Sequence, residues 1–267
     1  MQWENLTAND FANAVRETGV CVLPIGVLER HSDHLPLGTD FLNGHKLSCL
    51  AAEREAAVVF PPFYFGQICE ARCFPGAVAL KPALLLELLY SVLDEIGRNG
   101  FKKILIVNAH GGNTHMLSFL AQGMLSEERP YALYIADGTL DAARAQQWKT
   151  ICDTEVRGHA CECETSVSLA NHAHLVQMDK VPKEAGLPLG RMNGLPYNGF
   201  WWYADHPEHY RGDARTATIE KGLKLRELQV SFISETIAAI KADTVHSRLQ
   251  NEFFRCVDAL QSPSNVS

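Results

Sequence analysis

Short apolar runs alternate with longer amphipathic segments through the first half of the chain. Four apolar runs predict buried strands, at residues 20–24, 57–60, 104–107 and 131–135. The amphipathic segments between them predict helices, at residues 7–19, 40–55, 82–98 and 113–126. Strands that alternate with helices in this way indicate parallel βαβ units. The predicted fold class is α/β, a three-layer α/β/α sandwich with a mostly parallel central sheet.

The second half of the chain has one strong helical pattern and one long aperiodic stretch. Residues 218–241 predict a long amphipathic helix that closes the core. Residues 176–213 are rich in proline, glycine and aromatic residues without periodicity, so we expect an ordered excursion over one face. Because no internal repeat, low-complexity tract or linker interrupts the chain, we expect a single domain over residues 1–267.

Composition narrows the classes of function. The chain is 46% hydrophobic and 21% charged, which excludes a disordered or fibrous protein. Its net charge of −7 gives no general attraction to nucleic acid or to an anionic membrane, and no apolar run approaches the length that spans a bilayer. The first residues do not resemble a secretory signal, and the eight cysteines contain no CxxC pair. We therefore expect a cytoplasmic protein with a small-molecule partner.

Histidine and carboxylate residues gather directly after the first predicted strand. This segment, residues 29–40, contains Glu29, His31 and Asp40. In extended backbone, residues two apart project to the same side, so Glu29 and His31 can reach one common point. Asp40 begins a predicted helix and can turn back toward the same point.

Two further segments carry the same kinds of side chain. His110 follows the clearest predicted strand within residues 108–113, and His159 and Glu164 lie in residues 158–166, where a helix begins. The carboxyl ends of parallel strands meet at one edge of a sheet, where ligands bind in open α/β folds. We therefore expect these side chains to converge on one edge.

Each of these residues also has a structural interpretation. Glu29 and His31 could form an ion pair within a loop, and Asp40 could cap a helix. His110 could bond a backbone carbonyl at the end of a strand. Glu162 and Glu164 could be favoured in a first helical turn by the helix dipole alone. We assign structural or surface roles to His34, His115, His172, His174, His206 and His209. Cys161 and Cys163 are expected to be buried apolar fillers, because no other cysteine pair completes a thiolate site.

A mixed set of histidine and carboxylate ligands suits Zn²⁺, Mn²⁺ or Fe²⁺ better than a thiolate site would. With more than one carboxylate available, a bridging aspartate and two metals about 3.5–4 Å apart become possible.

At these residues the sequence resembles the creatininase (creatinine amidohydrolase) family. The family pattern contains G-S-x-E-x-H-G-x-H-L-P-x-x-x-D, N-x-H-G-G-N or a variant, H-A-G-E-x-E-T-S and, late in the chain, G-D-x-x-x-A-T-x-E-K-G. The corresponding blocks cover nearly the whole chain, at residues 26–40, 108–113, 159–166 and 212–222. The four blocks together are specific, whereas any one of them alone is weak.

The resemblance implies a homohexamer and a centre of two divalent metal ions in each subunit. By position, Glu29, Asp40 and His110 are implied to hold one metal. The other is implied to be held by His31, Asp40 and a second carboxylate.

The second carboxylate departs from creatininase itself, which has it two residues after the His110 position. This chain has Gly112 there, so we assign the role to Glu164, as in H-G-G-N relatives. The resemblance also implies that His159 is a proton shuttle, so His159 and Glu164 are the expected catalytic residues. Other departures, among them Cys161 in place of glycine, leave the metal ligands intact.

The substrate side of the site is less defined by sequence. Our candidates for substrate binding are Arg72, Asn113, Trp201 and Trp202. The aromatic cluster formed by Trp201, Trp202 and Tyr203 has a structural alternative, in which it packs a subunit interface.

The main functional hypothesis is an amidohydrolase that opens a creatinine-like cyclic amide with a hydroxide that bridges two metals, acting on non-peptide C–N bonds. One alternative keeps the site and opens another cyclic substrate, such as a formamide, a lactone or a cyclic keto-polyol like an oxidised inositol. The other alternative is a non-catalytic oligomeric binding protein.

Overall fold

A four-stranded parallel sheet lies at the centre of the protein. A computed structural model describes residues 1–138 and 140–261, and its strands are β1 (Val20–Ile25), β2 (Val58–Val59), β3 (Lys103–Asn108) and β4 (Ala132–Ala136). Their order in the sheet is β2-β1-β3-β4, and all neighbouring pairs are parallel. β1 and β3 pair in register from Val20 with Lys103 to Ile25 with Asn108, so their carboxyl ends finish side by side.

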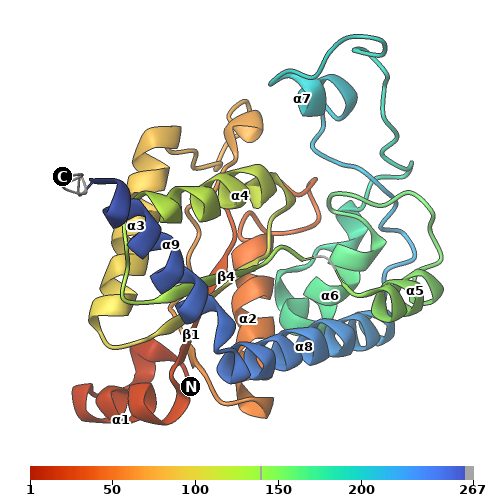
Figure 1. Ribbon diagram of the computed structural model, residues 1–267. Coiled ribbons are helices and arrows are strands. Elements are labelled where there is room, and N and C mark those ends of the chain that lie inside the picture. Colours follow the sequence, from red (N-terminus) through yellow and green to blue (C-terminus); the bar gives the residue numbers. More distant parts are fainter. Residues whose placement is uncertain (139, 262–267) are drawn as a thin grey trace, which may run out of the picture.

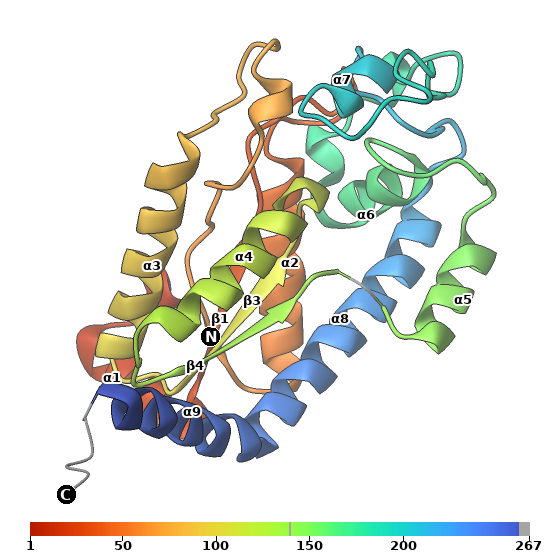
Figure 2. The same ribbon diagram turned by 45° about the horizontal axis from the view of Figure 1, so that its top comes forward.

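Helices cover both faces of the sheet, which confirms the predicted α/β/α sandwich (Figures 1 and 2). On one face, alternate strand residues such as Leu23 and Ile106 pack against α1 (Ala8–Thr18), α3 (Pro82–Arg98) and α4 (Thr114–Gly123). On the other face, Val22 and Leu105 pack against α2 (Thr39–Arg54) and α8 (Ile219–Ala242). The period of two along each strand therefore divides the core into two layers.

Most of the predicted helices begin and end where the local chemistry indicated. The Thr7 side chain accepts a hydrogen bond from the backbone N–H of Asp10 at the start of α1, and Gly19 ends that helix in the left-handed conformation, with a φ of 65°. α3 begins at Pro82, in the first turn that tolerates proline. Thr218 caps α8 by accepting from the backbone N–H of Lys221.

Other helices were not predicted from the sequence. α5 (Ala142–Ile151) has no buried residues and α9 (Val245–Gln261) follows the last predicted helix, while α7 (Trp201–Asp205) is a short helix within the aperiodic stretch. By contrast, α6 (Glu162–His172) begins within residues 158–166, where the sequence predicted the start of a helix. Short 3₁₀ turns complete the described structure: η1 (Trp3–Asn5), η2 (Cys69–Ala71), η3 (Gly111–Asn113), η4 (Met124–Ser126), η5 (Ala173–Leu175) and η6 (Met178–Lys180).

The segment that carries α7 lies beyond the carboxyl ends of the strands. Figure 2 shows α7 at the end of the molecule toward which the β3 and β4 arrows point, as expected for an excursion over one face of the molecule. Among the described residues, none of the helices combines the length and apolarity that crossing a bilayer requires.

Candidate metal centre

The candidate ligands come from segments that the sheet brings to one edge. Glu29 and His31 lie in the loop after β1, and His110 follows β3. Asp40 occupies the first turn of α2, which packs directly on the end of β1. Gly26 makes this close approach possible, because a Cβ there would lie only 2.3 Å from the backbone nitrogen of Phe41. The predicted convergence of these ligands is therefore observed.

Two groups of ligand atoms meet at this edge, and Asp40 belongs to both. In the first group, Nδ1 of His110 lies 2.8 Å from Oε1 of Glu29 and 2.9 Å from Oδ2 of Asp40. In the second, Nε2 of His31 lies 3.1 Å from Oδ1 of Asp40 and 3.5 Å from Oε1 of Glu164. The structure thus brings together all five predicted ligands in the two sets that the family resemblance implied, with one carboxylate shared.

The donor atoms fit divalent cations. Oε1 of Glu29, Oδ2 of Asp40 and Nε2 of His110 are buried and have no hydrogen-bond partner of normal geometry, although Nδ1 of His110 lies close to both oxygens. Burying carboxylate oxygens without compensation is costly. A cation bound beside Nδ1 of His110 would satisfy the two carboxylate oxygens, and the imidazole and carboxylate donors suit Zn²⁺, Mn²⁺ or Fe²⁺.

The neighbouring histidines keep the carboxylates ionised in spite of burial. Burial alone would raise the pKa of Glu164, but the charge and hydrogen bonding of His31 lower it to about 2. The pKa of Glu29 is likewise held well below its usual range, because His110, His159 and His209 outweigh the effect of burial. The same carboxylates raise the pKa values of His31 and His110, so a bound divalent cation would take the place of the protons on these histidines as the partner of the ionised carboxylates.

His159 lies over this centre rather than beside it. Its ring stacks on that of His31 with 4.2 Å between the centroids, and its Nε2 lies 2.8 Å from the carbonyl oxygen of Arg30. A carbonyl only accepts hydrogen bonds, so Nε2 carries the proton in this arrangement. Burial lowers the pKa of His159 below its ordinary value, which favours the neutral ring. Glu29, His31 and His159 form a third group of possible ligands, but Nε2 of His159, the nitrogen nearest Glu29, is occupied by its bond to Arg30.

His209 was assigned a structural or surface role, and it is part of the centre. Its Nε2 lies 2.7 Å from Oε2 of Glu29, and the indole N–H of Trp202 donates to its Nδ1 at 3.2 Å. Because an indole N–H only donates, Nδ1 must accept and Nε2 must carry the proton that bonds Glu29. Trp202 therefore fixes the tautomer of His209, and His209 orients Glu29. The residue is 180 positions from Glu29, and sequence spacing offered no signal for this contact.

Backbone strain is concentrated at the same place. Among the described residues, the non-glycine positions with positive φ are Ser32 at 54°, Ala160 at 54° and His209 at 52°. Ser32 follows His31, Ala160 follows His159, and the N–H of Ser32 donates to the carbonyl of His209. Residues in this conformation cost free energy, and they cluster where a site needs side chains in fixed positions.

Glu162 has a structural role, as its alternative interpretation proposed. Its fully buried carboxylate accepts bonds from the backbone N–H groups of Asp153 and Thr154, the hydroxyl of Thr154 and the ammonium of Lys221. Burial would raise the pKa of Glu162, but Lys221 and these donors lower it to about 2. The pair joins the start of α6 to the first turn of α8.

The two cysteines near this segment are buried as predicted. Cys161 and Cys163 are each 5% exposed and pack in a small apolar cluster with Cys152, Val167 and Leu225.

A cavity of about 1040 Å³ opens onto the two ligand groups. Trp201 and Trp202 line it, and the Trp202 ring lies 5.8 Å from that of His159, so this part of the aromatic cluster faces the centre. Trp201 is also 40% exposed and Tyr203 is 43% exposed, which leaves part of the cluster at the surface.

Two predicted substrate-binding residues do not reach this cavity. Asn113 is fully buried, where its side chain accepts from the backbone N–H of Gln67 and donates to Asn108. It therefore fixes the loop that carries His110. Arg72 is exposed at the end of η2, and its side chain is not part of the cavity wall. The prediction of substrate contacts for these two residues is not supported by their positions.

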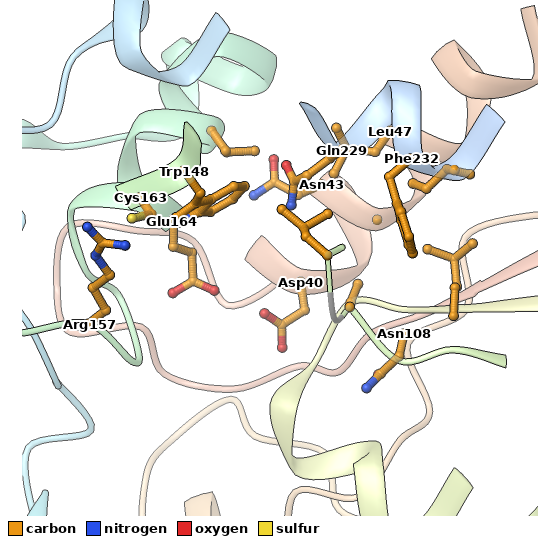
Figure 3. A pocket seen from close by; sticks show the side chains of 18 of the residues that line it. Asp40, Asn43, Leu47, Asn108, Trp148, Arg157, Cys163, Glu164, Gln229 and Phe232 are labelled. Carbon is orange, nitrogen blue, oxygen red and sulfur yellow. The ribbon is translucent and has the colours of Figure 1, made fainter. Parts of the chain in front are cut away.

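A second cavity, of about 320 Å³, lies on the other side of the carboxylates (Figure 3). Asp40 and Glu164 line both cavities. Figure 3 shows Arg157 next to Glu164, and Trp148 and Phe232 in the wall of this smaller cavity. The carboxylates of the centre therefore separate an aromatic-lined cavity from a smaller, mostly apolar one.

Comparison with known proteins identifies the family. The family described as "Creatininase: Creatinine amidohydrolase" matches residues 4–237. The chain belongs to the creatininase family. A solved creatinine amidohydrolase (creatininase) superposes with a TM-score of 0.75 at 23% identity, covering 91% of this chain and 98% of that one, which supports the shared fold.

Curated relatives of this creatininase-family chain carry different activities in their names. It is 33% identical to a mycofactocin precursor peptide peptidase of Mycolicibacterium smegmatis, over 83% of this chain and 85% of the relative. It is 25% identical to a creatinine amidohydrolase of Pseudomonas putida, over 82% and 88%. It is 23% identical to a 3-dehydro-scyllo-inosose hydrolase of Thermotoga maritima, over 89% and 83%. These relatives are hydrolases or peptidases with different substrates, so family membership leaves the substrate open.

Proposed function

We propose that this protein is a metal-dependent hydrolase that cleaves an amide C–N bond. The observation that carries the proposal is the pair of ligand groups that share Asp40, assembled from residues on four separate segments. A structural role for these side chains would not require two buried carboxylate oxygens that share a single imidazole nitrogen and have no hydrogen bond of normal geometry.

Glu29, Asp40 and His110 would hold one divalent cation, and His31, Asp40 and Glu164 would hold a second. When bound, such a pair of Zn²⁺, Mn²⁺ or Fe²⁺ ions lowers the pKa of a water molecule and polarises a carbonyl group.

The remaining chemistry belongs to side chains of the protein. His159 is neutral, because burial lowers its pKa, and its Nε2 proton is bonded to the carbonyl of Arg30. The other ring nitrogen can therefore accept a proton from the attacking water, and the resulting imidazolium can give that proton to the leaving nitrogen as the C–N bond breaks. His209 keeps Glu29 in place through the bond to Oε2. Trp201 and Trp202 form one wall of the cavity and reduce the access of bulk water to the reacting groups.

The proposed substrate is a small cyclic amide, as in the creatinine amidohydrolase relative. A second candidate is the ring opening of a cyclic keto-polyol, which the 3-dehydro-scyllo-inosose hydrolase relative favours. The relative at 33% identity is named for a peptide, so linear peptides also belong in the test.

The decisive experiment measures metal content and hydrolysis together. We expect two divalent metals per chain by elemental analysis, and turnover of one substrate class in a screen of cyclic amides, oxidised inositols and short peptides. Asp40→Asn should lose both metals and all turnover, because both groups need this carboxylate. Asp33→Asn is the matched control, since Asp33 is exposed and its ion pair within the described structure is with Arg30. An Asp40→Asn protein that keeps two metals contradicts the proposal. Absence of stoichiometric metal in the unmodified protein favours a non-catalytic binding protein.

We also propose that the chain acts as an oligomer, with the hexamer as the expected form. Large apolar side chains are exposed along the segment before and within α7, including Leu195, Tyr197 and Phe200. A subunit contact would cover them. Light scattering coupled to size exclusion checks this expectation, and a monomer at all protein concentrations contradicts it.

A further inference from the structure

The larger cavity contains one permanently charged cation among the described residues of its wall, and this residue is Arg211. Its side chain has no ion pair or hydrogen bond with the described part of the protein, and its Nε is buried without a partner. Arginines elsewhere in the protein, such as Arg144 and Arg215, pair with neighbouring carboxylates. Arg211 is therefore a half-buried cation that the protein itself does not neutralise.

The backbone around Arg211 holds it beside the proposed proton donor. The N–H of His159 donates to the carbonyl of Arg211 at 2.8 Å, and the N–H of Arg211 donates to the carbonyl of His159 at 2.9 Å. This pair of bonds fixes Arg211 directly opposite His159, at the edge of the cavity that opens onto the ligand groups.

The chain also leaves room for this side chain. Gly158 packs against the Arg211 stem so closely that an added Cβ would lie 2.4 Å from its Cδ and 2.7 Å from its Cγ. Any larger residue at position 158 would displace the arginine. The space for the Arg211 side chain is thus provided by the same segment that carries His159.

We propose that Arg211 binds a carboxylate group of the substrate, so that the substrate of this enzyme is an amide that also carries a carboxylate. A guanidinium group offers parallel N–H donors whose spacing matches the two oxygens of a carboxylate. A half-buried guanidinium gains most from an anion that enters the same water-poor cavity. This inference rests on the proposed function for the identity of the scissile bond, but the binding of the carboxylate does not depend on turnover.

Binding of matched acid and amide probes tests the proposal. The probes are 5-oxoproline against 5-oxoprolinamide, and N-acetylglycine against N-acetylglycinamide, titrated calorimetrically into the metal-loaded protein. Each pair differs only in the carboxylate. We expect at least one acid to bind about tenfold or more tightly than its amide, as for a charge-assisted bidentate contact. Inorganic phosphate in a separate titration shows whether the site prefers carboxylates to other oxyanions.

Substitutions show which arginine is responsible. Arg211→Met should reduce the preference to less than about twofold, and Arg211→Lys should keep part of it because the charge remains without the paired donors. Arg157→Met is the matched control, since Arg157 lines the smaller cavity on the far side of the carboxylates (Figure 3). Arg72→Met is a second control at an exposed position. Thermal unfolding and metal content confirm that each variant is folded and loaded.

Two results overturn the inference. One is an unmodified protein that binds neither acid more tightly than its amide. The other is a preference that persists in Arg211→Met, because the carboxylate would then be bound by the metals alone. If the preference depends on Arg211 but no amide is hydrolysed, the proposed function fails while this inference stands. If neutral amides are hydrolysed and neither acid is preferred, the proposed function stands and this inference fails.

Discussion

Replacing His209 tests whether a residue outside the ligand groups controls the metal centre. Asparagine is the suitable replacement, because it tolerates the left-handed backbone of His209, where φ is 52°, but its shorter side chain cannot reach Glu29. The change therefore removes one hydrogen bond to Oε2 of Glu29 with little disturbance of the backbone.

The size of the effect follows from that bond. A hydrogen bond to a charged group contributes about 1.5–3 kcal/mol, and each 1.4 kcal/mol corresponds to roughly tenfold in affinity. We expect His209→Asn to lower the affinity for the metal proposed to bind Glu29 by about ten- to a hundredfold. This range is typical of residues that orient a metal ligand. The metal held by His31 and Glu164 should be less affected. Trp202→Phe should have a smaller effect of the same kind, because it removes only the neutral bond that sets the tautomer of His209.

Competition with a chromophoric chelator measures both metal affinities. His209→Gln should restore part of the loss, since its longer side chain places a donor nearer to the position of Nε2. His115→Leu is the control, because His115 lines the same cavity but is exposed and belongs to neither ligand group. A folded His209→Asn protein with two unchanged affinities refutes the reasoning.

Three further predictions concern stability. Glu162→Gln should lower the free energy of unfolding by about 2–3 kcal/mol at neutral pH. Because the pKa of Glu162 is lowered to about 2, its contribution to stability is present above about pH 5 and is lost as the pH falls toward 2. Urea titrations should therefore show a weaker pH dependence for the variant than for the unmodified protein in that range. Gly222→Ala should destabilise the protein by about 1–3 kcal/mol, because the added Cβ would lie 1.8 Å from the carbonyl oxygen of Ser166 and push α8 away from α6; an unchanged unfolding midpoint contradicts this packing. Removing the metals with a chelator should lower the free energy of unfolding by about 2.7 kcal/mol for a metal present at a hundredfold excess over its Kd, and the thermal midpoint should fall accordingly. The Asp40→Asn protein should be insensitive to the chelator.

Local signals explain how much of the fold the sequence revealed. The β-branched run that becomes β3 and the proline that begins α3 act through sterics of the backbone itself, so both were predicted close to their observed bounds. α5 was missed because it has no fully buried residue and only isolated half-buried apolar positions, such as Trp148 and Ile151, which create little periodicity. α9 exposes Val245 and Leu249 but buries Phe254, and its amphipathic pattern is a signal for a helix that the prediction did not use.

The candidate site was predictable where strand ends decide position. Glu29 and His110 follow neighbouring parallel strands, and the pairing of β1 with β3 alone brings them together. Contacts that depend on loop conformation were not accessible in this way. His209 lies in the aperiodic stretch, Asn113 is turned inward by the 3₁₀ turn that contains it, and Arg72 is turned outward at the end of η2.

The close packing of α2 on the end of β1 couples the positions of the two ligand groups, because both contain Asp40. Asp40 lies in the first turn of α2, and later turns of this helix pack in the core through Leu47 and Ala51. Gly26 determines how closely α2 approaches the end of β1. Any substitution that shifts α2 relative to β1 moves the carboxylate oxygens of Asp40 away from both ligand groups at once. In the proposed two-ion centre, loss of one ion through such damage should be accompanied by loss of the other, and half-occupied protein should arise only from changes at the ligands that are not shared or at residues that orient them, such as His209.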